Sequence, residues 1–224
     1  MNERLWGILV DAFPKLLLYG VKVTLPLTAL SFALALVIAV IVALIQYARL
    51  RVLTQVCRFY IWVVRGTPLL VQLYLVFYGL PSLGITLDAF PTAVLVFGFN
   101  EGAYMAESVR GALESVSVGQ MEAGWCVGLN YLQIMVHIVL PQAFRAAFPA
   151  LSNSLISMMK GTSLAATITV TEMFRQATVI NGRVYESLGL YTEVAVIYLL
   201  FCSVLIWLQR LGERKLASYG GDRA

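Results

Sequence analysis

Long apolar runs limit what this chain can fold into more than any other feature of its sequence. The first run extends from about residue 14 to residue 46, which exceeds the roughly 20 residues that a helix needs to cross a bilayer. Of the 224 residues, 60% are hydrophobic and 12% are charged, and the mean hydropathy is +0.82. This composition predicts an all-α membrane protein with several spans and no second domain.

Five apolar runs are predicted as membrane spans: about 14–46, 59–80, 93–113, 141–171 and 190–211. Basic residues gather after the first span and at the end of the fifth: Arg49, Arg51, Arg58, Arg210, Arg214 and Lys215. Because Lys and Arg are enriched in cytoplasmic loops, both clusters are expected inside the cell. We therefore predict an external N-terminus with an amphipathic lead over residues 1–13, and a cytoplasmic tail over residues 212–224.

The composition also argues against several other classes of protein. The net charge of +4 is made up of sparse charges at the ends of apolar runs, so we expect no nucleic-acid partner. Cys57, Cys126 and Cys202 show no paired spacing, which predicts neither a disulfide framework nor a metal site. The first apolar run is too long for the core of a signal peptide, so no cleaved signal is expected.

One polar stretch, residues 117–141, fits neither a membrane span nor a loop. Two capping-box patterns divide it into two short helices: Ser117 with Gln120, and Asn130 with Gln133. Gly128 lies where a residue with a left-handed backbone would close the first helix. The stretch is therefore predicted to form two short helices joined by a tight turn.

The first of these helices has an apolar side with Met121 and Trp125, and it carries Glu122, Ala123 and Gly124 elsewhere. An apolar stripe beside an acid and small residues suits docking into a groove of another protein. The same pattern suits a helix that lies on the lipid surface. The helix pattern alone leaves both interpretations open.

Glu122-Ala123-Gly124, followed by Gly128 and by Ile-Val-Leu-Pro at 138–141, resembles the EAA loop of ABC importer permeases. The spacing matches throughout, and the one departure is Gly124 in place of the second alanine. In that family the loop is the cytoplasmic coupling helix that docks on the ATPase subunit. The resemblance implies a set of ATPase-coupling residues: Gln120, Glu122, Ala123, Gly124 and Gly128.

Three further strings resemble the permeases of polar amino-acid importers of the histidine, glutamine, arginine or cystine type: residues 65–81, 102–113 and 140–165. The resemblance implies a type I ABC importer transmembrane domain over residues 14–211, in the bacterial inner membrane. It also implies a pore made by a homodimer, or by a heterodimer with a homologous permease. Two ATPase subunits and an extracytoplasmic binding protein for the amino acid complete such an importer.

The chain itself is expected to hold no cofactor and to hydrolyse no ATP, because it has no GxxxxGK[ST] string to cradle phosphates. ATP and Mg would be used by the partner ATPase. The lone histidine, His137, lies within the predicted coupling stretch, so an enzyme is not expected. The alternative functions are an ion-coupled secondary amino-acid transporter and an ABC permease for another small solute.

A free amino acid carries a carboxylate and an ammonium group, so a site within the membrane must supply a partner for each. Arg65, on the broken second span, offers a planar fork for the carboxylate. Glu101 has no partner nearby in the sequence and suits the ammonium group; alternatively, Arg65 pairs with Glu101 or caps a helix. Other candidate substrate-lining residues are polar: Asn100, Ser154, Ser157, Lys160 and Thr162. Glu107 and Arg110, at i,i+3 spacing, are expected to pair.

Overall fold

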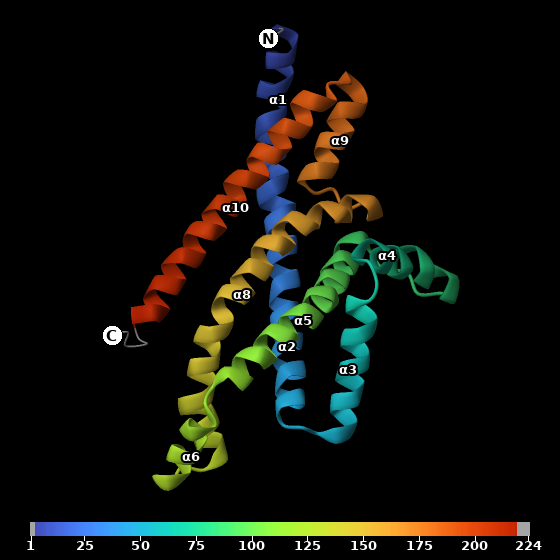
Figure 1. Ribbon diagram of the computed structural model, residues 1–224. Coiled ribbons are helices and arrows are strands. Elements are labelled where there is room, and N and C mark those ends of the chain that lie inside the picture. Colours follow the sequence, from blue (N-terminus) through green and yellow to red (C-terminus); the bar gives the residue numbers. More distant parts are fainter. Residues whose placement is uncertain (1–2, 219–224) are drawn as a thin grey trace. The chain divides into compact units, whose positions relative to one another are not determined.

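The computed structural model describes residues 3–218, and within that range every regular element is a helix (Figure 1). The α-helices are α1 (Glu3–Tyr19), α2 (Leu25–Tyr47), α3 (Arg51–Arg65), α4 (Leu69–Tyr74), α5 (Ala89–Ser115), α6 (Val118–Cys126), α7 (Tyr131–Ile134), α8 (Leu140–Gly161), α9 (Met173–Val184) and α10 (Ser187–Ser218). Shorter turns lie between them: π-helical at Gly20–Thr24, Leu75–Gly79 and Met135–Val139, and 3₁₀ at Leu80–Leu83 and Thr162–Ile168. The predicted all-α architecture is confirmed for this range.

The chain forms two compact units. The first unit contains the residues up to Leu34 together with 67–98 and 155–206, and the second contains 35–66, 99–154 and the residues from Trp207 onward. The helices α2, α5, α8 and α10 each contribute one part to each unit.

In the first unit, α1, α9 and α10 pack around one apolar core. Its fully buried side chains include Leu16, Met173, Ala177, Leu190 and Ile197. Gly20 allows the chain after α1 to approach α10, because a Cβ at this position would lie 2.6 Å from Cε2 of Phe201.

Glu172 caps the N-terminus of α9 from a fully buried position. Its carboxylate accepts hydrogen bonds from the backbone N–H groups of Phe174 at 2.8 Å and Arg175 at 2.6 Å, and from the Tyr198 hydroxyl at 2.9 Å. Burial raises the pKa of Glu172, while the three hydrogen bonds act in the opposite direction. The carboxylate therefore joins the start of α9 to α10.

The second unit is packed largely through small residues. Ala35, Ala39 and Ala43 recur every four residues along α2 and are all fully buried. A Cβ at Gly102 of α5 would lie 2.9 Å from Cγ2 of Ile38 on α2. Small side chains allow this close approach, which is how helices pack in a membrane, where the hydrophobic effect does not drive them together.

Each π-helical turn in the described chain ends two residues before a proline, namely Pro26, Pro81 or Pro141. A proline inside an α-helix lacks the N–H donor, and its ring collides with the carbonyl group four residues earlier. A π turn inserts an extra residue there and relieves the collision. The backbone N–H before the proline then bonds five residues back, from Leu25 to Gly20 and from Leu140 to Met135.

Three helical stretches of the described chain are long and apolar enough to cross a membrane: Glu3–Tyr47, Tyr131–Ile168 and Ser187–Leu216. A fourth span results if the bent pair of α3 and the segment Leu69–Leu83 is taken as one. The helix α5 has 27 residues but is less apolar, since Asn100, Glu101, Glu107 and Arg110 lie within it. The number of five spans therefore stays a prediction.

The termini of the described chain differ from the predicted boundaries. The expected lead over residues 1–13 is not a separate element, because α1 continues through Pro14 to Tyr19. Likewise α10 continues past residue 211 to Ser218. Residues 1–2 of the predicted lead and 219–224 of the predicted tail lie outside the described residues.

The predicted break in the second span, residues 59–80, is confirmed, but the helix bounds differ from the prediction. The helix α3 already begins at Arg51 and ends at Arg65, and α4 starts only at Leu69. Pro68 has an extended backbone (φ −64°, ψ 136°) and cannot donate an N–H to the preceding turn, which explains the break. The fourth span also begins early, since helix is continuous from Tyr131.

Candidate functional site

The first short helix of the polar stretch is α6, and a left-handed turn at Gly128 (φ +82°) follows it. The backbone N–H of Leu129 donates to the carbonyl of Gly124 at 3.0 Å, and that of Gly128 donates to Trp125 at 3.0 Å. These two bonds form a Schellman motif, which satisfies carbonyl groups left over at a helix C-terminus. The predicted left-handed conformation of Gly128 is confirmed.

Gly124 allows α6 to pack tightly against α7. It is buried, and a Cβ at this position would lie 2.7 Å from Cγ1 and 3.0 Å from Cδ1 of Ile134. Ile134 is itself fully buried. An alanine, as in the usual EAA pattern, would require Ile134 to move, so the glycine is matched to its neighbour.

The second capping box is confirmed and the first is wrong. The N–H of Gln133 donates to Oδ1 of Asn130, and the N–H of Asn130 donates to Oε1 of Gln133, each at 2.9 Å. Ser117 is the N-cap residue of α6, but its side chain makes no capping bond. The Gln120 side chain turns instead to Gln142, whose Nε2 lies 3.4 Å from Oε1 of Gln120.

Asn130→Ala is expected to destabilise the start of α7 by about 1 kcal/mol, because the N–H of Gln133 loses its acceptor. Hydrogen–deuterium exchange on the reconstituted protein should show the Gln133 amide exchanging about fivefold faster. Ser117→Ala is the matched control and should leave exchange at the start of α6 unchanged, because its hydroxyl makes no capping bond. Unchanged exchange in Asn130→Ala would contradict this role for the capping box.

α6, the turn after it and α7 expose apolar side chains around an acidic residue. Glu122 and Ala123 are exposed, and Trp125, Val127 and Leu132 are 53%, 75% and 70% exposed. Figure 1 shows α6 beyond the end of α5. Exposed apolar surface around a few polar groups is typical of an interaction site.

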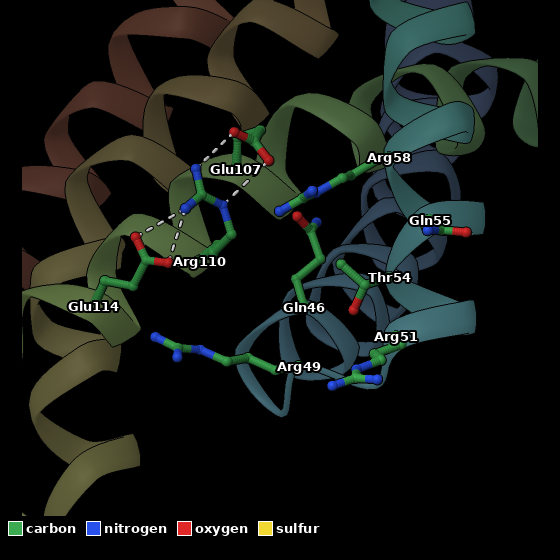
Figure 2. Close-up of a pocket in the computed structure, with 9 residues that line it drawn as sticks. All are labelled: Gln46, Arg49, Arg51, Thr54, Gln55, Arg58, Glu107, Arg110 and Glu114. Atoms are coloured by element: carbon green, nitrogen blue, oxygen red, sulfur yellow. Dashed lines mark hydrogen bonds and ion pairs between the residues drawn. The ribbon is translucent and has the colours of Figure 1, made fainter.

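A polar pocket of about 750 Å³ lies in the second unit between the α2–α3 turn and α5 (Figure 2). Its lining residues are Gln46, Arg49, Arg51, Thr54, Gln55, Arg58, Glu107, Arg110 and Glu114. We call it the arginine pocket. It contains the basic cluster that is expected on the cytoplasmic side, so the residues that predict orientation also form a cavity.

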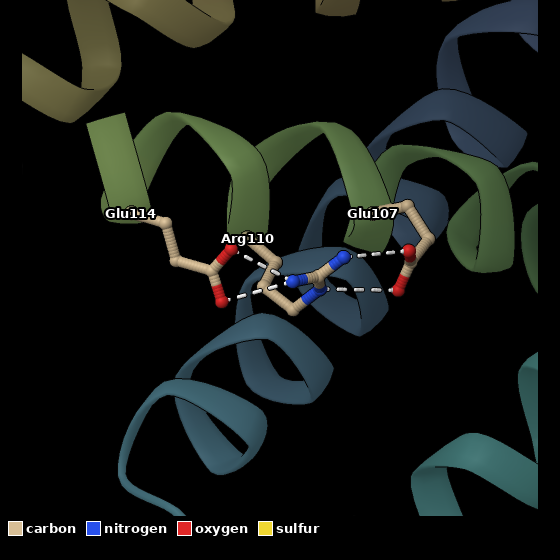
Figure 3. Close-up of polar contacts among 3 residues, drawn as sticks. All are labelled: Glu107, Arg110 and Glu114. Carbon is tan, nitrogen blue, oxygen red and sulfur yellow. Dashed lines mark hydrogen bonds and ion pairs between the residues drawn. The ribbon is translucent and has the colours of Figure 1, made fainter.

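Arg110 is held between two carboxylates of its own helix (Figure 3). Its Nη2 lies 2.9 Å from Oε2 of Glu107, and its Nη1 lies 2.8 Å from Oε2 of Glu114. Nε of Arg110 also donates to Oε1 of Glu107 at 3.3 Å, so that pair is bidentate, whereas Nη1 alone donates to both oxygens of Glu114, at 2.8 and 2.9 Å. The predicted Glu107–Arg110 pair is confirmed. Glu114 is missing from that prediction, although its i,i+4 spacing from Arg110 is a usable signal.

The second unit holds four of the candidate substrate residues. Glu101 and Ser154 share a hydrogen bond between their side chains, and Asn100 is buried. Arg65 is exposed at the end of α3, with Cζ 5.1 Å from the centre of the Tyr104 ring. Within residues 3–218 Arg65 forms no ion pair with Glu101, so the alternative of a structural pair between them is not supported.

The first unit holds the other three candidates. Ser157 and Lys160 are exposed on α8. Thr162 is fully buried, and its hydroxyl donates to the carbonyl of Met159 at 2.7 Å. Lys160 lines a pocket of about 480 Å³ together with Tyr198. The hydroxyl of Thr162 is thus already engaged within the chain. Lys160 is the cation among the three candidates of this unit, and it is exposed.

Comparison with known proteins gives matches over most of the chain. A family model described as the binding-protein-dependent transport system inner membrane component matches residues 35–218. The chain is 42% identical over 215 residues to the L-cystine transport system permease protein TcyB of Bacillus subtilis (strain 168), covering 96% of this chain and 92% of the relative. It is 37% identical over 210 residues to the probable amino-acid ABC transporter permease protein YckA of the same organism, covering 94% and 92%.

Solved structures give the same fold. The crystal structure of an amino acid ABC transporter with histidines has 32% sequence identity and a TM-score of 0.85, covering 92% of this chain and 96% of that chain. An inward-facing structure of the MetNI methionine ABC transporter has 17% identity and a TM-score of 0.69, covering 96% and 99%. At 17% identity the second likeness supports the fold alone.

Proposed function

Because this chain belongs to the family of binding-protein-dependent transport system inner membrane components, we propose that it is the pore subunit of an ATP-driven importer for a polar amino acid. Its relatives include a permease for L-cystine and a probable amino-acid permease, each matched over nearly the whole chain. A subunit of this family moves solute and leaves ATP hydrolysis, with its Mg, to a separate ATPase.

The observation that carries the coupling role is the geometry of α6, the Gly128 turn and α7. Two short helices, locked together by the contact of Gly124 with Ile134, hold Glu122 and Ala123 on an exposed surface. Because α6, the Gly128 turn and α7 are held together and exposed, a movement of a docked ATPase can be transmitted through them to the permease. The proposed ATPase-coupling residues are Gln120, Glu122, Ala123, Gly124 and Gly128. Gly124 is buried against Ile134 and holds α6 in place, while the other four are exposed to a partner.

The proposed assembly has two permease subunits, identical or homologous, two ATPases and an extracytoplasmic binding protein. Each permease crosses the bacterial inner membrane five times over residues 14–211, with its N-terminus outside.

The importer function is tested by purifying the tagged chain from its native membranes and reconstituting it. The expected result is a co-purifying ATPase whose activity rises when the binding protein and one polar amino acid are added. Uptake that stops when ion gradients collapse, with no co-purifying ATPase, would favour an ion-coupled transporter.

The topology predicts which single cysteines an impermeant maleimide reaches in spheroplasts. In a chain without Cys57, Cys126 and Cys202, we expect Ser82→Cys and Gly182→Cys to be labelled, since both positions are exposed and lie on the proposed outer side. Leu50→Cys and Val127→Cys, also at exposed positions, should be labelled only after permeabilisation. Labelling of either inner position in sealed spheroplasts would contradict the proposed orientation.

A further inference from the structure

The arginine pocket holds more positive charge than its own carboxylates neutralise. Within residues 3–218, Arg49, Arg51 and Arg58 form no ion pair, whereas Arg110 engages both glutamates of the pocket. The lining therefore has two more positive than negative charges. Figure 2 shows Arg58 reaching from α3 toward the part of α5 that carries Glu107.

The backbone at the pocket adds to this positive character. The helix α3 begins at Arg51, and its N-cap residue Leu50 offers no side-chain bond to the first turn. The first N–H groups of a helix carry partial positive charge and favour an anion. Arginine forks match the oxygens of phosphate groups. Several forks around about 750 Å³ suit an anion with several oxygens and a substituent.

An apolar stripe adjoins the pocket on the same helix. Val52, Val56 and Phe59 are 74%, 60% and 64% exposed. Each follows a pocket-lining residue of α3 by one position, so the stripe lies about 100° around the helix from the pocket. A ligand with an anionic group and apolar chains matches both surfaces at once.

We propose that the arginine pocket binds a phosphate ester, and that the adjoining stripe makes an anionic phospholipid its occupant. The headgroup phosphate accepts hydrogen bonds from Arg49 and Arg58, and the acyl chains lie against the Val52–Phe59 side of α3. In the orientation proposed above this places the lipid in the cytoplasmic leaflet, where anionic headgroups attract basic segments. The lipid site rests on that orientation, while the phosphate chemistry of the pocket does not.

The test measures thermal unfolding of the full-length protein, as it assembles, in an uncharged detergent. Dioctanoyl phosphatidylglycerol, dioctanoyl phosphatidylcholine and inorganic phosphate are titrated separately. We expect phosphatidylglycerol to raise Tm by about 5 °C at a hundred times its Kd, because a ligand that binds only the folded state stabilises it. Phosphatidylcholine, with the same chains but no net charge, should leave Tm nearly unchanged.

Substitutions then locate the effect. Arg49→Gln with Arg58→Gln is expected to weaken phosphatidylglycerol binding at least fivefold, while the control Arg210→Gln with Arg214→Gln removes the same charge from α10 and should keep the parental Kd. Arg49→Lys with Arg58→Lys preserves the charge and the membrane orientation but removes the planar guanidinium groups. This variant replaces the glutamine variant in the binding measurement if the glutamine variant fails to assemble. Hydrogen exchange of the unmodified protein provides an independent readout, with protection expected over residues 49–58 on adding phosphatidylglycerol.

The outcomes separate the sources of the phosphate. Binding of inorganic phosphate as tight as that of phosphatidylglycerol would support the phosphate site with a soluble ligand as its occupant. Equal stabilisation by the two lipids, or a parental Kd in both Arg49/Arg58 variants, would overturn the proposal. A glutamine variant that keeps lipid binding but loses the co-purifying ATPase would also overturn it and make the pocket a protein contact. Failure of the importer assignment appears separately, in the uptake and ATPase measurements.

Discussion

Gly124→Val is expected to lower amino-acid uptake by at least thirtyfold while leaving the subunit inserted in the membrane. A Cβ at this position would lie 2.7 Å from Cγ1 of Ile134 and 3.4 Å from Cδ1 of Ile138. Since Ile134 is fully buried, relief comes most readily from moving α6 away from α7. Several proposed ATPase contacts would shift together, and a thirtyfold loss needs only about 2 kcal/mol.

Two further variants make this result specific. Gly119→Val introduces the same side chain on the same helix, where a Cβ meets only Oγ of Ser117 at 3.6 Å, so uptake should stay near the parental rate. Adding Ile134→Ala to Gly124→Val makes room for the valine and should restore part of the uptake. In Gly124→Val the basal ATPase rate should stay at the parental level, whereas the stimulation of ATPase activity by substrate should be lost together with uptake. Parental stimulation in Gly124→Val would show that the ATPase docks elsewhere.

Local signals in the sequence predicted local structure well when no distant group competed for the same side chain. Asn130 and Gln133 form their capping box, in which each side chain accepts a hydrogen bond from the backbone N–H of the other residue. Gln120 has the same spacing from Ser117, but Gln142, 22 residues along the chain, takes its side chain. This bond joins α6 to α8 across a long stretch of sequence, so no residue within the capping motif predicts it.

Other features depend on contacts that spacing does not encode. Glu101 meets Ser154 from a different helix, so no local pattern pairs them. Glu172 caps α9 although glutamate is not among the preferred N-cap residues, and its third hydrogen bond comes from Tyr198 on α10. The break at Pro68 follows from the sequence and is confirmed, whereas nothing in the sequence predicts that Pro26 and Pro141 follow π turns within continuous helices. Gly66 beside Pro68 is the local difference that favours a break.

The substrate site was predicted from the chemistry of an amino acid, and the structure refines its test. Arg65 and Glu101 form no ion pair within residues 3–218, and each has a different neighbour, Tyr104 for the arginine and Ser154 for the glutamate. Removing either charge therefore breaks no ion pair between these two residues. Both Arg65→Gln and Glu101→Gln are expected to assemble at near-parental yield, unlike variants that break a buried ion pair.

Glu101→Gln is expected to reduce uptake between about tenfold and a hundredfold, because a hydrogen bond to a charged ligand group contributes about 1.5–3 kcal/mol. The amide can still bond to Ser154, so the loss would reflect the missing negative charge. Arg65→Gln should fall in the same range, because its exposed guanidinium lies over the Tyr104 ring and makes no ion pair among residues 3–218. Glu193→Gln neutralises a comparable half-buried carboxyl on α10 and should transport normally. Uptake, basal ATPase rate and yield are measured for all three; if Arg65→Gln and Glu101→Gln assemble and transport at the parental rate, neither residue contacts the substrate.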